Sequence, residues 1–368
     1  MKKMIVALVI VSGSAVWGQV IKSAETCGEC HQRNFAQWQQ SSHSGSATDP
    51  LYQAVLNTLP PESERRTRCS RCHEPVRHLD IPATLANEMA TEGVTCDMCH
   101  AVNWQESSRN QYVLGPENVK YGPYEDAIPS IHEHEYSQAL SSSSSCISCH
   151  HDVGTEPLIT CSTESEYVNS SFYKAGVTCQ DCHMPERAGK SAELGKWRES
   201  VYSHVFYGGS TPRMLYDCAT LNGKLKYRDN NIVLSLSVTN QSVGHALPTG
   251  SPLRAVYLKI TATSEQDSLL WSNYKTNPLN EDPDALFMRV LSDAQGNAPC
   301  IPTRARQLVF DHRLQPDETR QFEYVLPDTL VDRIQASLYY RSFPPNLQDQ
   351  LNVDPQDPIL IQSKTFNR

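Results

Sequence analysis

Alternation of apolar and polar residues dominates the last part of the chain. Four runs show it, at residues 232–239, 256–261, 322–326 and 334–340. Side chains on a strand point alternately to its two faces, so a period of two predicts strands with one buried face. Turn residues separate the runs, and this arrangement is typical of an antiparallel β-sandwich. We therefore predict a β-sandwich domain over residues 215–368.

The first two of these runs are joined by a segment rich in glycine and proline, residues 240–250. Such residues favour a defined turn. We expect His245 at the tip of this turn.

Helical spacing appears instead near the start of the chain. Phe35 and Trp38 are three residues apart, so they share one face of a short predicted helix. That helix would place His43 at its end. The alternative is a plain amphipathic helix with His43 at the surface.

The first residues have the layout of a secretory signal peptide. Lys2 and Lys3 precede an apolar run over residues 4–16, and small or polar residues follow. The run is short for a transmembrane helix, although an uncleaved anchor is the alternative. We predict a signal peptide over residues 1–18, cleavage at Gly18-Gln19, and no membrane span in the mature chain.

Cysteine usage changes this picture of an ordinary two-domain protein. The pattern C-x-x-C-H occurs five times, at residues 27–31, 69–73, 96–100, 146–150 and 179–183. It is the attachment motif of c-type haem. Two thiols one helical turn apart each form a thioether with a haem vinyl group, and the following histidine becomes the proximal iron ligand. Zinc binding, a thioredoxin-like site or a disulfide framework would each leave the repeated histidine unexplained.

The motifs therefore predict five covalently attached haems c. The cysteines that would hold them are Cys27, Cys30, Cys69, Cys72, Cys96, Cys99, Cys146, Cys149, Cys179 and Cys182. The proximal ligands would be His31, His73, His100, His150 and His183. Residues 19–214 would form this haem-packed, mostly helical and loop-rich domain, which makes the fold class α+β.

Two segments inside the haem domain resemble each other. The triplet Gly-Val-Thr precedes the third motif at residues 93–95 and the fifth at residues 176–178. This repeat suggests two similar two-haem modules. Each glycine would allow the backbone to approach a flat cofactor closely, or would only end a loop. The five serines at 141–145 are expected to form the turn that starts the helix of the fourth motif.

Charge and the remaining cysteines restrict the partners and the compartment. The formal net charge is −9, and removal of Lys2 and Lys3 makes it −11. Nucleic acid and anionic membrane surfaces are therefore poor partners. Haem c attachment takes place outside the bacterial cytoplasm, which agrees with export to the periplasm or the exterior. Cys161, Cys218 and Cys300 lie outside the motifs, and one pair of them could form a disulfide, without the sequence choosing which.

These motifs together resemble multihaem cytochromes of the cytochrome c554-like type. The resemblance rests on the run 27–43 and the Gly-Val-Thr-Cys-x-x-Cys-His segments. It also rests on residues 203–209 and on Gly-His-x-x-Pro-Thr-Gly at 244–250, which look like related multihaem proteins with a β-domain. It implies electron transfer through closely packed haems that mostly have two histidine ligands. Five motifs and an added β-domain depart from the tetrahaem pattern.

The resemblance also implies distal ligands. His43, His204 and His245 lie in loops that match it, and His132 competes with His134 for a fourth iron. The sequence does not identify the fifth distal ligand. His78 is the first candidate for it, and the weaker ones are His151, His312, Met89, Met214 and Met288.

Three functions remain at this stage. The first is a non-enzymatic electron carrier whose partners are other cytochromes or a membrane quinol dehydrogenase. The second is an oxidoreductase in which one haem lacks a distal ligand and acts on a small nitrogen or sulfur species. The third is a subunit of an extracellular cytochrome conduit or filament.

Overall fold

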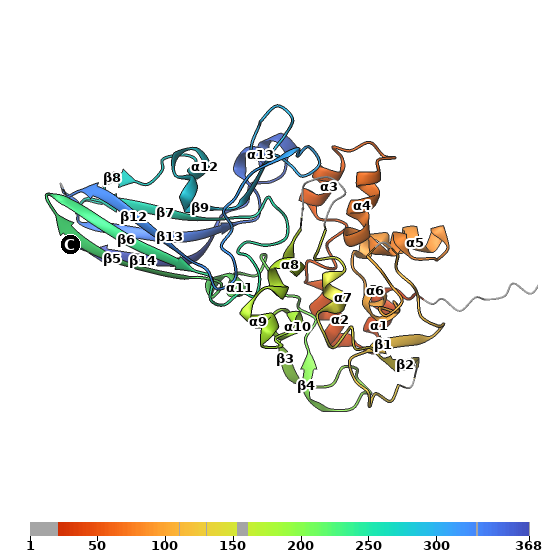
Figure 1. Ribbon diagram of the computed structural model, residues 1–368. Coiled ribbons are helices and arrows are strands. Elements are labelled where there is room, and N and C mark those ends of the chain that lie inside the picture. Colours follow the sequence, from red (N-terminus) through yellow and green to blue (C-terminus); the bar gives the residue numbers. More distant parts are fainter. Residues whose placement is uncertain (1–20, 110, 130, 153–160, 329, 368) are drawn as a thin grey trace, which may run out of the picture.

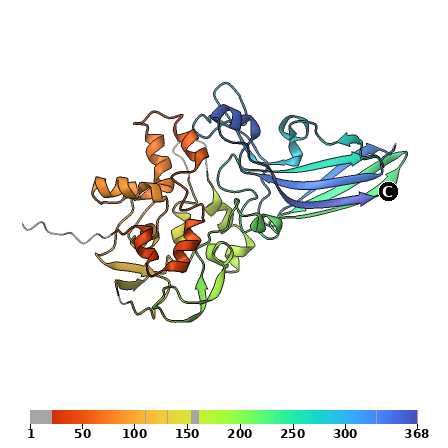
Figure 2. The same ribbon diagram turned by 180° about the vertical axis from the view of Figure 1, so that it is seen from behind.

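The computed structural model describes residues 21–109, 111–129, 131–152, 161–328 and 330–367. The predicted signal peptide and its cleavage point lie outside these residues. The described chain forms a lobe of short helices and loops, followed by an elongated lobe of strands whose far tip carries the C-terminus (Figures 1 and 2). The predicted α+β class is confirmed.

Short helices and 3-10 turns build the first lobe. In chain order they are α1 (Ala24–Gly28), α2 (Gln32–Gln39), α3 (Pro50–Leu56), α4 (Glu64–His73), η1 (Pro75–His78), α5 (Ala83–Met89), η2 (Ala90–Glu92), α6 (Cys96–His100), α7 (Ser144–Ile147), α8 (Thr163–Val168), α9 (Ser171–Lys174), α10 (Cys179–His183) and α11 (Pro212–Tyr216). Each C-x-x-C-H motif includes helical residues: the third and fifth form α6 and α10, the second ends α4, and the first and fourth start within α1 and α7. At the first and fourth motifs, the N–H of the histidine donates to the carbonyl of the first cysteine at 2.9 and 3.1 Å. This turn places both thiols and the imidazole on one side of the chain.

Two small sheets hold the loops of this lobe. β1 (Val119–Gly122) pairs in parallel with β2 (Glu133–Tyr136), and β3 (Glu186–Gly189) pairs antiparallel with β4 (Arg198–Tyr202). The first pair fixes the segment that contains the two competing histidines, His132 and His134. Among the described residues no helix is long and apolar enough to cross a bilayer.

Two antiparallel sheets build the second lobe, together with a two-stranded ladder of β10 (Arg289–Ser292) and β11 (Gln307–Asp311). One sheet has the order β12 (Thr319–Pro327), β6 (Asn231–Thr239), β5 (Thr220–Arg228). The other has the order β14 (Ile359–Asn367), β13 (Arg333–Arg341), β7 (Ala255–Thr263), β8 (Leu269–Ser272), and β9 (Leu286–Phe287) pairs with β7. Three short elements lie outside the strands, and they are α12 (Pro278–Glu281), η3 (Pro283–Ala285) and α13 (Pro345–Leu351).

The alternating apolar positions of both sheets meet in one core. Leu236 of β6, Leu258 of β7 and Leu338 of β13 belong to the same cluster and are at most 1 % exposed. Burial of such side chains stabilises each by about 1.5–3 kcal/mol. The sandwich therefore has its own apolar core, as its sequence pattern predicts.

The segment between the first two alternating runs differs from a simple turn. β6 and β7 lie in different sheets, so residues 240–254 cross from one sheet to the other instead of closing a hairpin. Leu247 and Leu314 exchange backbone hydrogen bonds of 2.8 and 3.0 Å. This bridge holds the crossing loop, with His245 on it, against the sandwich.

Helices α3 and α13 join the two lobes on one side of the molecule (Figure 1). Leu51 and Val55 of α3 pack on a buried cluster that contains Leu253, Phe343 and Leu347. The sandwich therefore covers one side of the helical lobe through apolar contact.

The serine segment forms the predicted turn and also ties two motifs together. Ser143 caps α7, and its hydroxyl accepts the backbone N–H of Cys179 at 3.1 Å. Gln180 Nε2 donates to the carbonyl of Ser142 at 2.6 Å. The segment lies against the fifth motif and is not a free linker.

Gly93 has a different role from the predicted approach to a cofactor. Its φ is +65°, and a Cβ there would lie 2.4 Å from the carbonyl oxygen of His43. Gly176, its counterpart in the repeat, has a φ of +77° and open space around it. Gly93 is needed because the chain before the third motif passes close to the backbone of His43.

These two glycines give a matched test. Gly176→Ala should cost about 1–2 kcal/mol of stability, because only the positive φ opposes it. Gly93→Ala should cost roughly 2–4 kcal/mol, because steric overlap with His43 adds to the same strain. Chemical denaturation of the two holoproteins, followed by Soret absorbance, measures the difference. Equal costs would contradict the close approach to His43.

Candidate haem sites

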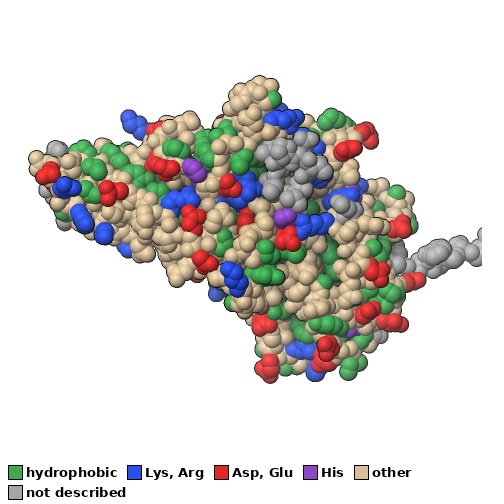
Figure 3. Space-filling view, in the orientation of Figure 1, with side chains coloured by type: hydrophobic (Ala, Val, Ile, Leu, Met, Phe, Trp, Pro, Cys, Tyr) green, Lys and Arg blue, Asp and Glu red, His purple; other side chains and the backbone are tan. Residues whose placement is uncertain are grey.

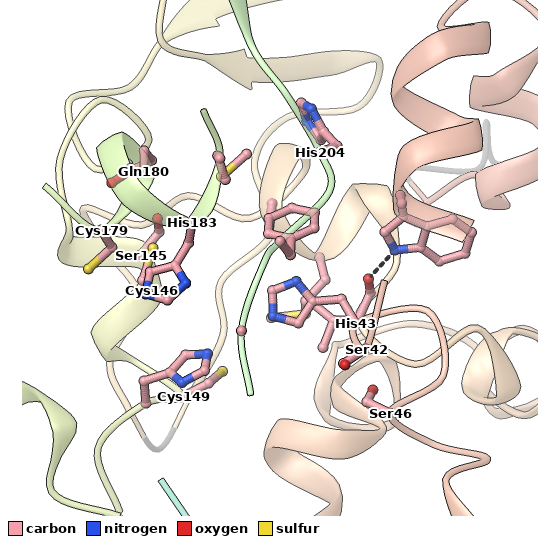
Figure 4. A pocket seen from close by; sticks show the side chains of 18 of the residues that line it. Ser42, His43, Ser46, Ser145, Cys146, Cys149, Cys179, Gln180, His183 and His204 are labelled. Atoms are coloured by element: carbon pink, nitrogen blue, oxygen red, sulfur yellow. Dashed lines mark hydrogen bonds between the residues drawn. The ribbon is translucent and has the colours of Figure 1, made fainter. Parts of the chain in front are cut away.

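All the motif side chains open into one continuous cavity of about 1820 Å³. The ten motif cysteines and the five motif histidines line it, and so do His43, His132, His204 and His245. The cysteines are free thiols in this structure, and they stand for the thioether sulfurs of attached haems. Figure 4 shows part of this cavity, with His43 and His183 reaching into it from separate segments. We number the sites 1 to 5 in chain order of their motifs.

Four motif histidines each face a second histidine. The pairs are His31 with His132 at site 1, His100 with His204 at site 3, His150 with His43 at site 4, and His183 with His245 at site 5. Their ring centroids are 6.3, 6.2, 6.3 and 6.2 Å apart. The structure therefore brings together four of the predicted distal histidines with four predicted proximal ones.

These spacings fit an iron between the rings. A metal–imidazole bond of about 2.0 Å and roughly 1.1 Å from nitrogen to ring centre put two trans imidazoles about 6.2 Å apart. A direct stacking contact would be much shorter, such as the 4.1 Å between His312 and Phe310. The side chains present thus fit bis-histidine haem at these four sites.

Hydrogen bonds at Nδ1 orient the rings. His31, His100 and His183 each donate to a backbone carbonyl, of Ser191, Tyr121 and Tyr207 respectively. A donating Nδ1–H fixes the tautomer in which Nε2 is free to bind a metal. His132 and His245 have the same arrangement with the carbonyls of the residues that follow them.

Burial keeps the ring nitrogens neutral. It lowers the pKa of His43 and His245 to about 4, and neighbouring histidines add to the effect. The pKa of His150 and His204 falls to about 3 for the same reasons. A neutral imidazole is the form that binds a metal.

Site 2 differs from the other four. Tyr52 stacks on His73 with ring centroids 4.1 Å apart and planes 4° apart, and its hydroxyl donates to Glu74 at 2.9 Å. His73 Nδ1 lies 3.1 Å from the carbonyl of Ser46. In the described part of the chain, no second histidine ring faces His73 in the way seen at the other sites.

None of the candidates for the fifth distal ligand is seen to pair with His73 in the described part of the chain. His78 Nε2 is 2.8 Å from the hydroxyl of Ser70, and His78 is not among the cavity-lining residues that the structure describes. His151 lies 3.4 Å from Glu164. His134, the predicted competitor of His132, also lines the cavity and stands over Gly122. Met89 and Met288 are buried in apolar clusters, whereas Met214 lines the cavity from α11.

The five sites adjoin one another. Thiol hydrogen bonds connect Cys27 with Cys96 and Cys146 with Cys179. Cys72 Sγ also lies 3.7 Å from the carbonyl of Cys149. These contacts join site 1 to site 3 and site 4 to sites 2 and 5, and the two groups line one and the same cavity.

The three other cysteines lie apart and form no disulfide. Cys218 lies in the sandwich core and Cys300 in a small neighbouring cluster. Cys161 lines the cavity. The structure therefore pairs none of them.

Two kinds of residue around the sites carry no signal in the sequence. Tyr52 on His73 and Phe206 on His43 are aromatic contacts between segments distant in sequence. Glu166 and Arg313 form a buried ion pair of 2.6 Å near site 5. Nothing in a single sequence indicates such long-range contacts.

Cysteines, histidine pairs and cavity together define a multihaem c-type cytochrome. Residues 26–101 match the family model for cytochrome c554 and c-prime. The chain also resembles the crystal structure of a penta-heme cytochrome c552 from Thermochromatium tepidum. The two are 25% identical with a TM-score of 0.77, over 95% of this chain and 99% of the other. A search of curated proteins finds no match.

The pair at site 5 is the one that spans the two lobes, so it gives the sharpest test. His245→Ala in the holoprotein should open one iron, and a high-spin ferric signal should replace one low-spin signal in the electron paramagnetic resonance spectrum. His312→Ala is the control, because His312 stacks on Phe310 outside the cavity lining. If His245→Ala leaves every haem low-spin, His245 is only a loop residue.

Proposed function

We propose that this protein carries electrons through five covalently attached haems c, of which at least four have two histidine ligands. The four imidazole pairs at 6.2–6.3 Å carry this proposal. Iron with two protein ligands has no free position for a substrate and suits outer-sphere electron transfer. The contact between sites supports it, because electron tunnelling falls steeply with distance.

The proposed partners are redox proteins, either other cytochromes or a membrane quinol dehydrogenase. The acidic net charge of −9 favours a partner with a basic docking surface. On the face shown in Figure 3, acidic and basic side chains are interspersed and form no broad basic patch of the kind that binds nucleic acid. We place the protein in the periplasm or outside the cell, following its predicted signal peptide.

A second candidate function rests on site 2. No histidine faces His73 among the described residues. The ring that packs on His73 belongs to Tyr52, whose hydroxyl donates to Glu74 and is therefore already engaged. An open iron at this site would bind and reduce or oxidise a small nitrogen or sulfur species, with the other haems supplying or removing electrons.

Haem content and electron transfer test the first function. The purified protein should contain five haems by pyridine haemochrome assay, and acid-acetone should release none of them. After reduction, an added soluble cytochrome should reoxidise all five. Two or fewer haems per chain, or a fraction that stays reduced, would contradict a continuous electron path.

Carbon monoxide decides between the two functions. If site 2 is open, the reduced protein should bind one carbon monoxide per chain. His73→Met, which replaces the lone proximal ligand, should change that spectrum, while His78→Ala should leave it unchanged. Absence of any carbon monoxide complex would exclude the second candidate and leave the electron carrier.

A further inference from the structure

A buried carboxylate lies where the helical lobe meets the loop that carries His245. Glu166 Oε1 accepts hydrogen bonds from Arg313 Nη1 at 2.6 Å and from the hydroxyl of Ser162. Its Oε2 accepts from Thr249 Oγ1 at 2.5 Å and from the backbone N–H of Ala246 at 3.2 Å. The side chains of Glu166 and Arg313 are both 5 % exposed. Four donors thus converge on one carboxylate that has almost no contact with water.

Two of these donors belong to the crossing loop that carries His245. The peptide between His245 and Ala246 is held at two points. Glu166 accepts its N–H, and Asn240 Nδ2 donates to its carbonyl oxygen, that of His245, at 2.9 Å. The carboxylate comes from α8 of the helical lobe, whereas Asn240 lies within the crossing loop. A hydrogen bond of 2.8 Å between the hydroxyls of Thr163, also in α8, and Thr249 adds a second tie. Glu166 is therefore the charged contact that fixes this loop relative to the haem lobe, and the one that binds the backbone next to His245.

Arg313 keeps the carboxylate ionised in this buried position. Its Nε and Nη2 donate to Asp311 at 2.8 and 2.9 Å, and Arg289 Nε donates to Asp311 at 2.9 Å. The cluster contains two acidic and two basic side chains, so its formal charges cancel. Removal of only one member of such a buried pair strongly destabilises the protein, because the other charge is then buried without a partner.

We propose that Glu166 is a positioning residue for site 5, which holds His245 at the iron and sets the angle between its ring and that of His183. The two rings are 17° apart. This inference rests on the proposed ligation of site 5 by His245. It assigns to the ion pair between the lobes a function in haem ligation beyond cohesion of the fold.

A glutamine cannot replace this carboxylate. Its amide has one acceptor oxygen, and this oxygen would accept the hydrogen bonds from the charged Arg313 and from Ser162. The NH₂ group would then face the N–H of Ala246, two donors would oppose each other, and the loop would lose the hydrogen bond next to His245. Glu166→Gln should therefore change the ring angle at site 5 and leave a positive charge uncompensated nearby. Both effects should change the site-5 haem, and the added positive charge alone raises its reduction potential.

Asp311→Asn provides a matched control. Like Glu166→Gln, it removes one negative charge that is paired with Arg313. Asp311, however, has no hydrogen bond to the crossing loop. If the ion pair only stabilises the fold, both substitutions should affect the ligand geometry at site 5 equally. If Glu166 positions the loop, only Glu166→Gln should change that geometry.

The experiment compares the holoproteins with Glu166→Gln and Asp311→Asn by electron paramagnetic resonance and redox titration. The g values of a low-spin haem depend on the angle between its two imidazole planes. His245→Ala first identifies the site-5 signal as the one that it abolishes. We expect Glu166→Gln to shift the g values of that signal and raise its potential, with the other three paired sites unchanged. Asp311→Asn should leave those g values unchanged.

Thr249→Val keeps the inference testable if Glu166→Gln does not fold. It removes the hydrogen bonds of the Thr249 hydroxyl to Glu166 and to Thr163 and retains the ion pair, so a smaller shift of the same signal is expected. Thr163→Val removes only the second of these hydrogen bonds, and it should leave the signal unchanged. Unchanged g values in Glu166→Gln or Thr249→Val, or an equal shift in Asp311→Asn, would overturn the positioning role. If His245→Ala abolishes no low-spin signal, the ligation itself is wrong, and the inference falls with it.

Discussion

The pairing of four motif histidines with second imidazoles, at the spacing that an iron between them would need, is the constraint on which the haem lobe depends. Each pair joins a motif histidine to a segment far away in the sequence, such as His31 with His132 and His100 with His204. The helices that carry these residues are short, and α4, with ten residues, is the longest described in this lobe. Isolated helices below about 12–15 residues are marginal in water. In the proposed ligation, the cofactors and their ligands therefore add to the short helices and to the small apolar cluster that contains Met89 and Met98.

The sandwich, in contrast, is held together by its own apolar core. The two lobes meet at the candidate haem sites. Its core of alternating side chains from both sheets needs no cofactor. Its crossing loop then places His245 against His183, and its helix α13 packs beside α3 near site 2. In the proposed function, the β-lobe thus completes site 5, and its crossing loop belongs both to the electron path and to the contact between the lobes.

The sequence predicted those features whose cause is local. Covalent attachment demands two thiols and a histidine at fixed spacing, so Cys96, Cys99 and His100 can be identified without a structure. Alternation likewise predicted the strands, because burial of one face acts residue by residue. The partner of each motif histidine could not be deduced in the same way. His132 rather than His134 faces His31 only because the β1–β2 ladder sets the register of that segment. Gly93, Glu166 and the crossing loop were misjudged or missed because their contacts depend on chain segments that only the fold brings together.

The position of the irons tests this account most directly. A crystal structure of the holoprotein with anomalous data at the iron absorption edge would locate each iron independently of the chain. We predict five peaks, four of them midway between the paired imidazoles, each about 2.0 Å from two Nε2 atoms. The fifth should lie beside His73 with no histidine on its other side. Fewer than five peaks, or irons bound to one motif histidine without its paired partner, would contradict the account.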